Sequence, residues 1–183
     1  KEKINSNINE SVDAYYNLEI DKSLALSKIA LDKSYFIQDP NCISKSYNLI
    51  AINFGEFGNV EKQIYYYNKA IEYAQKAKND TLNIVANFNL ANVYFRNLKN
   101  YPKAIEYFSK HLSLGEKIKS KKEIADAKIN LCEVYFEKKE FEKGFLLINQ
   151  SDLEIENFKD IEISISFYHQ KGVYYFQKKQ YDL

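Results

Sequence analysis

The chain has 183 residues, and its 26 basic and 25 acidic side chains leave a formal net charge of +1. This length allows one globular domain or a short repeat array. Five glycines and two prolines are too few for the frequent turns of an all-β sandwich, and an aromatic content of 15% excludes a disordered chain. Because the net charge is close to zero, we expect no direct binding of nucleic acid. Apolar runs are too short to span a bilayer, so we expect no membrane insertion by this segment.

Apolar residues recur with the period of an α-helix along nearly the whole chain. Pro102 is expected just inside a helix start, where its missing N–H costs nothing, and Asn79 is expected to cap another helix. Gly58 supplies a turn that can hold a positive φ. Residues 151–160 show the weakest pattern and could form a broken or bent end of the eighth helix. In chain order, the expected helices span residues 4–18, 21–37, 42–57, 60–78, 81–98, 102–119, 121–138, 141–157 and 160–179.

One type of segment recurs along the chain. A small residue is followed three positions later by an aromatic residue, and both recur at spacings of 40, 41 and 40 residues. The small residues are Ala51, Ala91, Cys132 and Gly172, and the aromatic residues are Phe54, Tyr94, Tyr135 and Tyr175. A second apolar stretch follows the earlier copies, so each repeat is expected to form two helices joined by a short polar turn. The expected repeats are about 4–40, 41–79, 80–120, 121–159 and a truncated fifth, 160–183.

The segment from Leu90 to Tyr94 and the Ala-Ile-Glu-Tyr-Phe run that begins at Ala104 resemble tetratricopeptide (TPR) repeats. The resemblance implies an all-α fold, a right-handed superhelix of antiparallel helix pairs in a single array over residues 1–183. Two features depart from the pattern. The period is near 40 rather than 34 residues, and His111 replaces a small residue, which should loosen or tilt the packing. The chain looks most like the TPR regions of Bacteroidetes-like bacterial signalling and transcriptional regulators.

In TPR arrays the first helix of each repeat lines the concave face, so the resemblance implies a groove for a protein or an extended peptide. One recurring row in it consists of amides, which can hydrogen-bond to a peptide backbone, and a second row consists of phenylalanines. The amide row is Asn89, Asn130 and Gln170, and the phenylalanine row is Phe95, Phe136 and Phe176. The full set of groove residues is Asn48, Phe88, Asn89, Asn92, Phe95, Arg96, Asn130, Glu133, Phe136, His169, Gln170 and Phe176.

Each feature of this groove also has a structural explanation. The amides can solvate the groove or cap neighbouring residues, and the phenylalanines can form core between helices. Arg96, the sole arginine, could take a ligand carboxylate or be merely solvated. Acidic residues such as Glu133 disfavour an acidic C-terminal peptide as the ligand.

The sequence offers little support for catalysis. His111 and His169 lie far apart, no cluster has metal-ligand spacing, and no glycine-rich phosphate loop is present. We therefore predict a non-enzymatic module, without cofactor or metal, that binds a protein or peptide as the sensory or scaffolding part of a larger bacterial regulatory protein. One alternative is an oligomerisation module that self-associates through the truncated fifth repeat, with Val173 and Tyr174 on an exposed apolar face. Another is a domain that senses a small molecule or a signal peptide.

The cellular compartment stays open at this stage. Cys42 and Cys132 are expected to be buried thiols, which do not distinguish compartments. The N-terminus carries no apolar signal core. The cytoplasm is favoured, and the periplasm remains open if a signal peptide has been removed.

Overall fold

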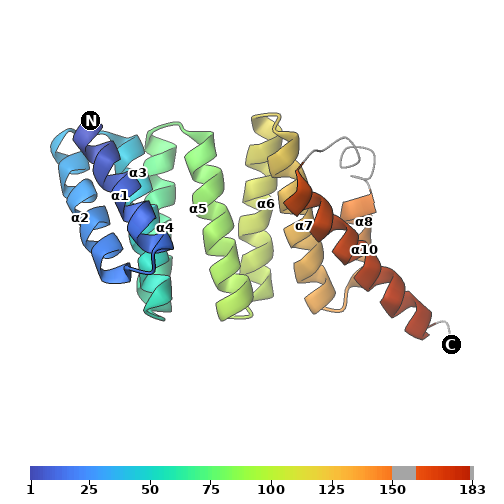
Figure 1. The fold of residues 1–183 in the computed structure, drawn as a ribbon. Helices are drawn as coiled ribbons and strands as arrows, with labels where there is room; N and C mark the ends of the chain where they lie inside the picture. Colours follow the sequence, from blue (N-terminus) through green and yellow to red (C-terminus); the bar gives the residue numbers. More distant parts are fainter. Residues whose placement is uncertain (150–159, 182–183) are drawn as a thin grey trace. The chain divides into compact units, whose positions relative to one another are not determined.

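A computed structural model describes residues 1–149 and 160–181 of the chain. The regular elements in these ranges are all helices, which confirms the all-α expectation (Figure 1). In chain order they are α1 (Glu2–Tyr16), α2 (Ile20–Phe36), α3 (Pro40–Glu56), α4 (Val60–Lys76), α5 (Asp80–Asn92), the π-helical turn η1 (Val93–Asn97), α6 (Tyr101–Lys117), α7 (Lys121–Glu137), α8 (Phe141–Asn149) and α10 (Ile161–Tyr181). The expected bent end of the eighth helix falls on 150–159, outside the described residues. Within the described ranges, every helix is too short or too polar to cross a bilayer.

The helices pack as pairs. Helices α1 and α2, α3 and α4, and α7 and α8 are close neighbours, and we call these pairs repeats 1, 2 and 4. Repeat 3 consists of α5, η1 and α6, and repeat 5 of α10. The chain divides into two compact units, an N-terminal unit of Lys1–Val93 and a C-terminal unit of Tyr94–Leu183.

Side-chain caps define most of the helix starts. The Asn79 side chain accepts a hydrogen bond from the backbone N–H of Leu82 at 3.1 Å, which confirms its predicted role. Asn100 caps α6 in the same way, and Pro102 occupies the first turn of that helix as expected. Asp39 accepts from two backbone N–H groups at the start of α3. These caps satisfy donors that a helix start leaves unpaired.

Each helix-to-helix turn that the structure describes places a residue with a positive φ just before the cap of the next helix. The residues with positive φ are Leu18, Gln38, Gly58, Lys78, Lys99, Lys119 and Lys139. Gly58 adopts this conformation without strain, as predicted. The other positions hold side chains in it, so this turn is imposed by the packing of the helices rather than by glycine.

The uneven repeat spacing is explained by the π-helical turn η1. The left-handed turn residue follows the buried small residue by seven positions in repeats 2 and 4 but by eight in repeat 3. In repeat 2 the backbone N–H of the cap Asn59 donates to the carbonyl of Phe54, five residues earlier. In repeat 3 the backbone N–H of the cap Asn100 donates to the carbonyl of Tyr94, six residues earlier. Repeat 3 therefore contains one inserted residue, which the wider π turn accommodates.

Tyrosines build much of the packing in the N-terminal unit. The Tyr35 hydroxyl lies 2.8 Å from that of Tyr47 and donates to that of Tyr73 at 2.9 Å, joining α2, α3 and α4. The Tyr66 ring stacks on Phe54 with centroids 5.4 Å apart. Because the hydroxyl of the buried Tyr47 has that of Tyr35 as a partner, this tyrosine can serve as a core residue. Small residues fill the closest contacts, and Cys42 is a buried free thiol as expected.

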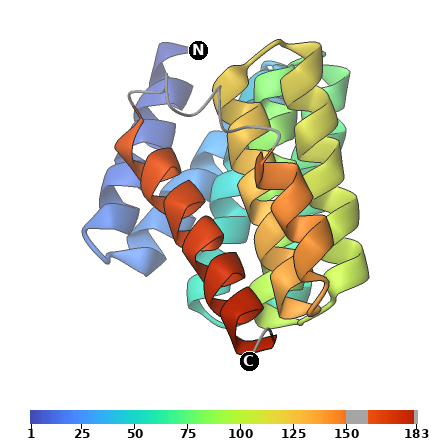
Figure 2. The ribbon, with the colours of Figure 1, turned by 90° about the vertical axis from the view of Figure 1, so that its right-hand side faces the viewer.

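In the C-terminal unit, α7, α8 and α10 share a hydrophobic core (Figure 2). Phe167 and Tyr174 of α10 are buried in it, together with Ile148 of α8 and the free thiol of Cys132. The expectation that Val173 and Tyr174 lie on an exposed face is wrong. Tyr174 is buried and Val173 packs against the same core, because this side of α10 faces α7 and α8.

His111 is buried inside the C-terminal unit, where a small residue was expected. Its Nε2 lies 2.9 Å from the Glu123 carboxylate, across the contact between α6 and α7. Gly115 allows that contact, because a Cβ there would lie 3.1 Å from the Cβ of Glu123 and 3.2 Å from the backbone nitrogen of Ile124. The helices remain closely packed around the imidazole, which is 1% exposed.

Candidate functional site

The first helices of the N-terminal unit lie beside one another and form a pocket. Helix α3 contacts α1 on one side and α5 on the other. All three contribute to a pocket of about 210 Å³. Its lining residues are Ile8, Val12, Ser44, Lys45, Asn48, Leu49, Leu82 and Val85.

The pocket has an apolar base and a polar rim. Ile8 and Leu49 are buried at its base, while Val85 is exposed at its edge. Ser44 is not free for a ligand, because its hydroxyl donates to the Ala70 carbonyl at 2.8 Å. Lys45 and Asn48 are the polar side chains left in the lining. The pocket can therefore hold one apolar side chain, with a cation and an amide beside it.

The predicted amide Asn89 lies next to this pocket. Its Nδ2 donates to the Oδ1 of Asn48 at 3.0 Å, linking α5 to α3. That bond uses one of the two Nδ2 protons, so both amides are oriented while hydrogen-bonding capacity remains. Asn92 instead donates to the Phe88 carbonyl one turn earlier, at 3.1 Å, and both residues are half-buried.

A second link fixes α1 against α3. The Tyr15 hydroxyl donates to the Glu56 carboxylate at 2.8 Å. This hydrogen bond, with burial as a smaller cause, raises the pKa of Tyr15 to about 12. The phenol therefore stays protonated and the link stays intact throughout the neutral pH range.

The polar groove residues predicted in the C-terminal unit include several that already have partners within the chain. Arg96, on η1, contacts the Glu133 carboxylate through both terminal nitrogens, at 3.1 and 3.4 Å. Asn130 donates to the backbone and side chain of Asp126. Burial raises the pKa of Asp126, and the charge of His111 opposes that rise. A ligand would have to compete with these internal contacts.

Three predicted groove residues prove to be core. Phe95 is 3% exposed and packs against Tyr101, with ring centroids 6.1 Å apart, and Phe136 is 7% exposed. Gln170 is 8% exposed. These side chains face other helices of the unit. The helical period alone could not predict this, because it does not show which neighbour covers each face of a helix. Phe176 and His169 are exposed, so the phenylalanine row does not form one surface.

The sequence interpretation missed most of the pocket. Ile8 and Val12 stand 40 residues before Asn48 and Ile52, so a stricter register would have placed them on the same face. They were overlooked because the first helix of repeat 1 lacks the small-aromatic signature. Lys45 lies three residues before Asn48, and Val85 lies four residues before Asn89, so each is one turn earlier on its helix than a predicted amide. Among the described residues, His, Cys, Asp and Glu do not gather in threes that could hold a metal.

Comparison with known proteins gives structural matches. No protein-family profile and no curated protein matches the chain. The apo form of RapI matches with a TM-score of 0.84 at 18% identity, over 95% of this chain and 48% of RapI. A Rap protein complexed with Competence and Sporulation Factor matches at 0.80 and 17% identity, over 91% and 46%. The chain thus spans about half the length of these proteins.

A third structure decides the fold. It is a signal transduction ATPase (STAND) protein with a tetratricopeptide repeat sensor from Pyrococcus horikoshii, which matches with a TM-score of 0.79 at 23% identity, over 96% of this chain and 27% of that one. The chain has the tetratricopeptide-repeat fold. In TPR terms, the pocket lies on the first-helix face of repeats 1 to 3, within the N-terminal unit.

Proposed function

We propose that this chain is a non-enzymatic TPR module that binds an extended segment of a protein or peptide. The binding surface is the first-helix face of the N-terminal unit. An apolar ligand side chain enters the pocket, and the amides of Asn48 and Asn89 bond to the neighbouring ligand backbone. The observation that carries the proposal is the pocket itself, which combines a buried apolar base with the hydrogen-bonded amide pair at its rim.

The size of the pocket favours a side chain over a whole small molecule. Sites for drug-sized ligands typically occupy about 300–1,000 Å³, whereas this pocket holds about 210 Å³. Such a volume suits one branched or aromatic side chain. Lys45, exposed at the rim, favours a ligand with an acidic group or a free carbonyl beside that side chain.

The comparisons supply a biological context for the proposal. One similar structure is a Rap protein complexed with Competence and Sporulation Factor, and another is a STAND protein with a TPR sensor. By analogy, we place the module in the sensory or scaffolding part of a larger bacterial regulatory protein. The Arg96–Glu133 pair makes the C-terminal unit a weaker candidate, because the guanidinium already holds a carboxylate.

The test is selection of ligands from a phage-displayed library of random peptides on the immobilised chain. The selected peptides should share an apolar residue, and Val85→Trp should weaken their binding at least about tenfold by filling the pocket. Asn89→Ala should weaken it roughly three- to tenfold, the usual effect of losing one hydrogen bond. Binding is measured by fluorescence anisotropy of the synthetic peptides.

Tyr65→Trp is the matched control, because it adds bulk at an exposed position of α4 that is not part of the pocket lining. It should leave the affinities unchanged. Selected peptides that bind Val85→Trp and the parent chain equally well would overturn the proposed surface.

A further inference from the structure

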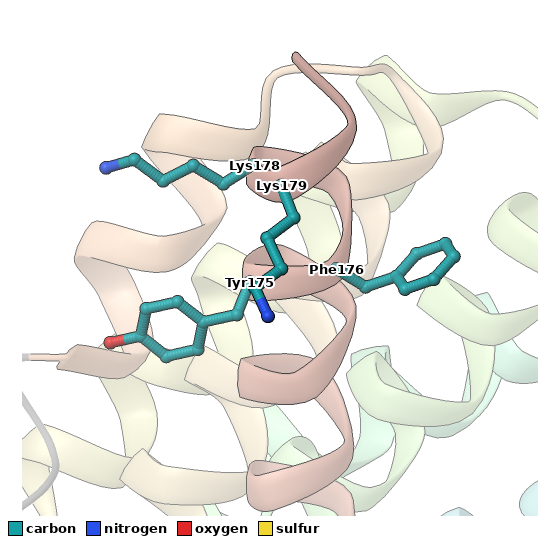
Figure 3. A pocket seen from close by; sticks show the side chains of 4 residues that line it. All are labelled: Tyr175, Phe176, Lys178 and Lys179. Carbon is teal, nitrogen blue, oxygen red and sulfur yellow. The ribbon is translucent and has the colours of Figure 1, made fainter. Parts of the chain in front are cut away.

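His111 is an ionisable side chain that the C-terminal unit encloses. The charged side chains at the end of α10 show the usual contrast, because Lys178 and Lys179 are exposed and line a hollow of about 400 Å³ together with Tyr175 and Phe176 (Figure 3). The imidazole of His111 on α6 is only 1% exposed. A buried ionisable group is costly unless partner groups balance its charge. The partners of this imidazole therefore indicate which protonation state the fold favours.

Glu123 of α7 is the first partner. Its carboxylate lies 2.9 Å from the Nε2 of His111, across the contact between α6 and α7. Glu123 stands three residues after the cap Ser120, the spacing at which a glutamate often accepts from the backbone N–H of the cap residue. That N–H instead donates to the Gly115 carbonyl at 3.0 Å. The carboxylate is therefore directed to the imidazole rather than to the start of its own helix.

Asp126 is a second carboxylate at the same contact. It follows Glu123 by three residues and so lies on the same side of α7. Its Oδ1 accepts a hydrogen bond from the Asn130 Nδ2 at 3.2 Å. Burial is the largest cause that raises the pKa of Asp126, and the charge of Glu123 adds to the rise, whereas the charge of His111 opposes it. One imidazole thus balances two carboxylates where little water reaches them.

Two ion pairs flank this cluster. The ammonium of Lys122 on α7 lies 2.8 Å from the carboxylate of Asp160, at the start of α10. Lys122 therefore lowers the pKa of Asp126 only as the smallest of its causes. Further along α7, Glu133 is held by the guanidinium of Arg96 on η1. Because these flanking charges have partners, the charge of the cluster depends mainly on the protons that its three members bind.

The number of bound protons decides whether the contact is favourable. When the imidazole of His111 is protonated, its positive charge offsets one of the two carboxylates. When that proton leaves, two negative charges face each other where water screens them poorly, which is unfavourable. Asp126 acts in the same direction. Because its pKa is raised in the fold, its stabilising contribution is present below the ordinary pKa of an aspartate and is lost as the pH rises through the raised value.

We propose that His111, Glu123 and Asp126 form a proton-binding site that holds α6 against α7 when it is occupied and loosens this contact when the proton leaves. Histidine is the side chain whose charge ordinarily changes between about pH 5 and 8, so a switch built on it works in the physiological range. The module then responds to pH through its C-terminal unit. The inference does not rest on the peptide pocket, which lies in the N-terminal unit.

The first test is the variant Asp126→Asn, which keeps the shape of the side chain and removes its charge. At pH 7.5 its midpoint of urea denaturation should exceed that of the parent chain by roughly 0.3–1 M. The difference should shrink as the pH falls to 4.5, because the parent chain then protonates Asp126 itself. Circular dichroism at a series of pH values measures both midpoints.

Asp160→Asn is the matched control, because it is the same substitution at a carboxylate whose pKa is lowered, chiefly by the hydrogen bond from Lys122. The stabilising contribution of Asp160 is present above the ordinary pKa of an aspartate and is lost as the pH falls through the lowered value. This variant should therefore unfold at less urea than the parent chain at pH 7.5. Opposite signs for the two substitutions separate the buried cluster from a general effect of removing negative charge.

Native-state hydrogen exchange, corrected for the intrinsic pH dependence of exchange, locates the effect in the molecule. In the parent chain, amides of α6 and α7 should lose protection between pH 5.5 and 7.5 relative to those of α1 and α2. In His111→Gln this relative loss should fall to less than about half, because glutamine cannot take up a proton. Asp126→Asn should reduce the same loss, which keeps the test decisive if the glutamine variant does not fold.

Two results would overturn the proposal. One is a difference in urea midpoint between Asp126→Asn and the parent chain that is equal at pH 4.5 and 7.5, or that has the opposite sign at pH 7.5. The other is a loss of protection with rising pH that is as large in α1 and α2 as in α6 and α7.

Discussion

Helices α7 and α10 are the first helices of successive repeats, yet their surfaces differ. Cys132 of α7 is fully buried, whereas Gly172, the equivalent residue 40 positions later, is exposed on α10. Both helices contribute to the core of the C-terminal unit. Helix α7 also packs against α8 on the face that α10 leaves exposed. The repeat sequence therefore specifies which face of a helix is suited to packing against another helix, and the neighbouring helix decides whether that face is core or surface.

The largest expected difference is in thiol reactivity at these two positions. Burial raises the pKa of Cys132 to about 12, so its thiolate is scarce at pH 8, whereas an exposed thiol has a pKa near 8.5. In the Gly172→Cys variant, iodoacetamide at pH 8 should modify the introduced thiol at least about a thousandfold faster than Cys132. Because the thiolate is the reactive form, the rate at Cys132 should rise about tenfold per pH unit while the chain stays folded.

The rates are measured by mass spectrometry of proteolytic fragments. Cys42, the other buried thiol, is an internal control and should also react slowly. Comparable rates at positions 132 and 172 would mean that the α10 face is covered in solution.

The next largest effect contrasts the two faces of α10 itself. Phe167→Ala removes a fully buried ring from the core and should lower the free energy of unfolding by about 3–5 kcal/mol. Tyr168→Ala, at the adjacent and exposed position, should change it by no more than about 0.5 kcal/mol. Urea denaturation followed by circular dichroism measures both. A large loss for Tyr168→Ala would show that the exposed face of α10 supports the fold of the chain.

The smallest effect concerns the same substitution at equivalent positions of two repeats. Ala51→Leu overpacks the fully buried contact between α3 and α4 and should cost about 1–3 kcal/mol. Gly172→Leu should instead stabilise the chain by up to about 1 kcal/mol, because leucine favours a helix more than glycine does and a Cβ at this position meets none of the described residues. Both values come from urea denaturation. Equal destabilisation by the two substitutions would contradict the difference between the covered and exposed faces.

Much of the fold could be predicted from local signals. The cap at Asn79, the turn at Gly58 and the proline at the start of α6 are short-range features, and the structure confirms them. The 41-residue spacing from Ala91 to Cys132 indicates one inserted residue, but it does not predict a π turn. The contacts on both sides of the inserted residue determine which backbone conformation accommodates it.

The candidate site was harder to predict. The spacing placed Asn48 and Asn89 on related helix faces, but their hydrogen bond results from how α3 and α5 pack. Phe95 and Phe136 were proposed for the groove and proved to be core, because a ring near the edge of a helix face can turn either way. The pocket also needs Ile8 and Val12 from a helix whose repeat signature is weak.

By itself, the sequence determined the helices and their pairing into repeats. Low glycine and proline content and a 40-residue period suffice for those conclusions, since they depend on local propensity and periodicity. Only the tertiary structure decided which aromatic residues are core, which amides are joined, and which side of α10 remains uncovered. Those outcomes depend on contacts between residues far apart in the chain, and the same residue type is buried or exposed according to its neighbours.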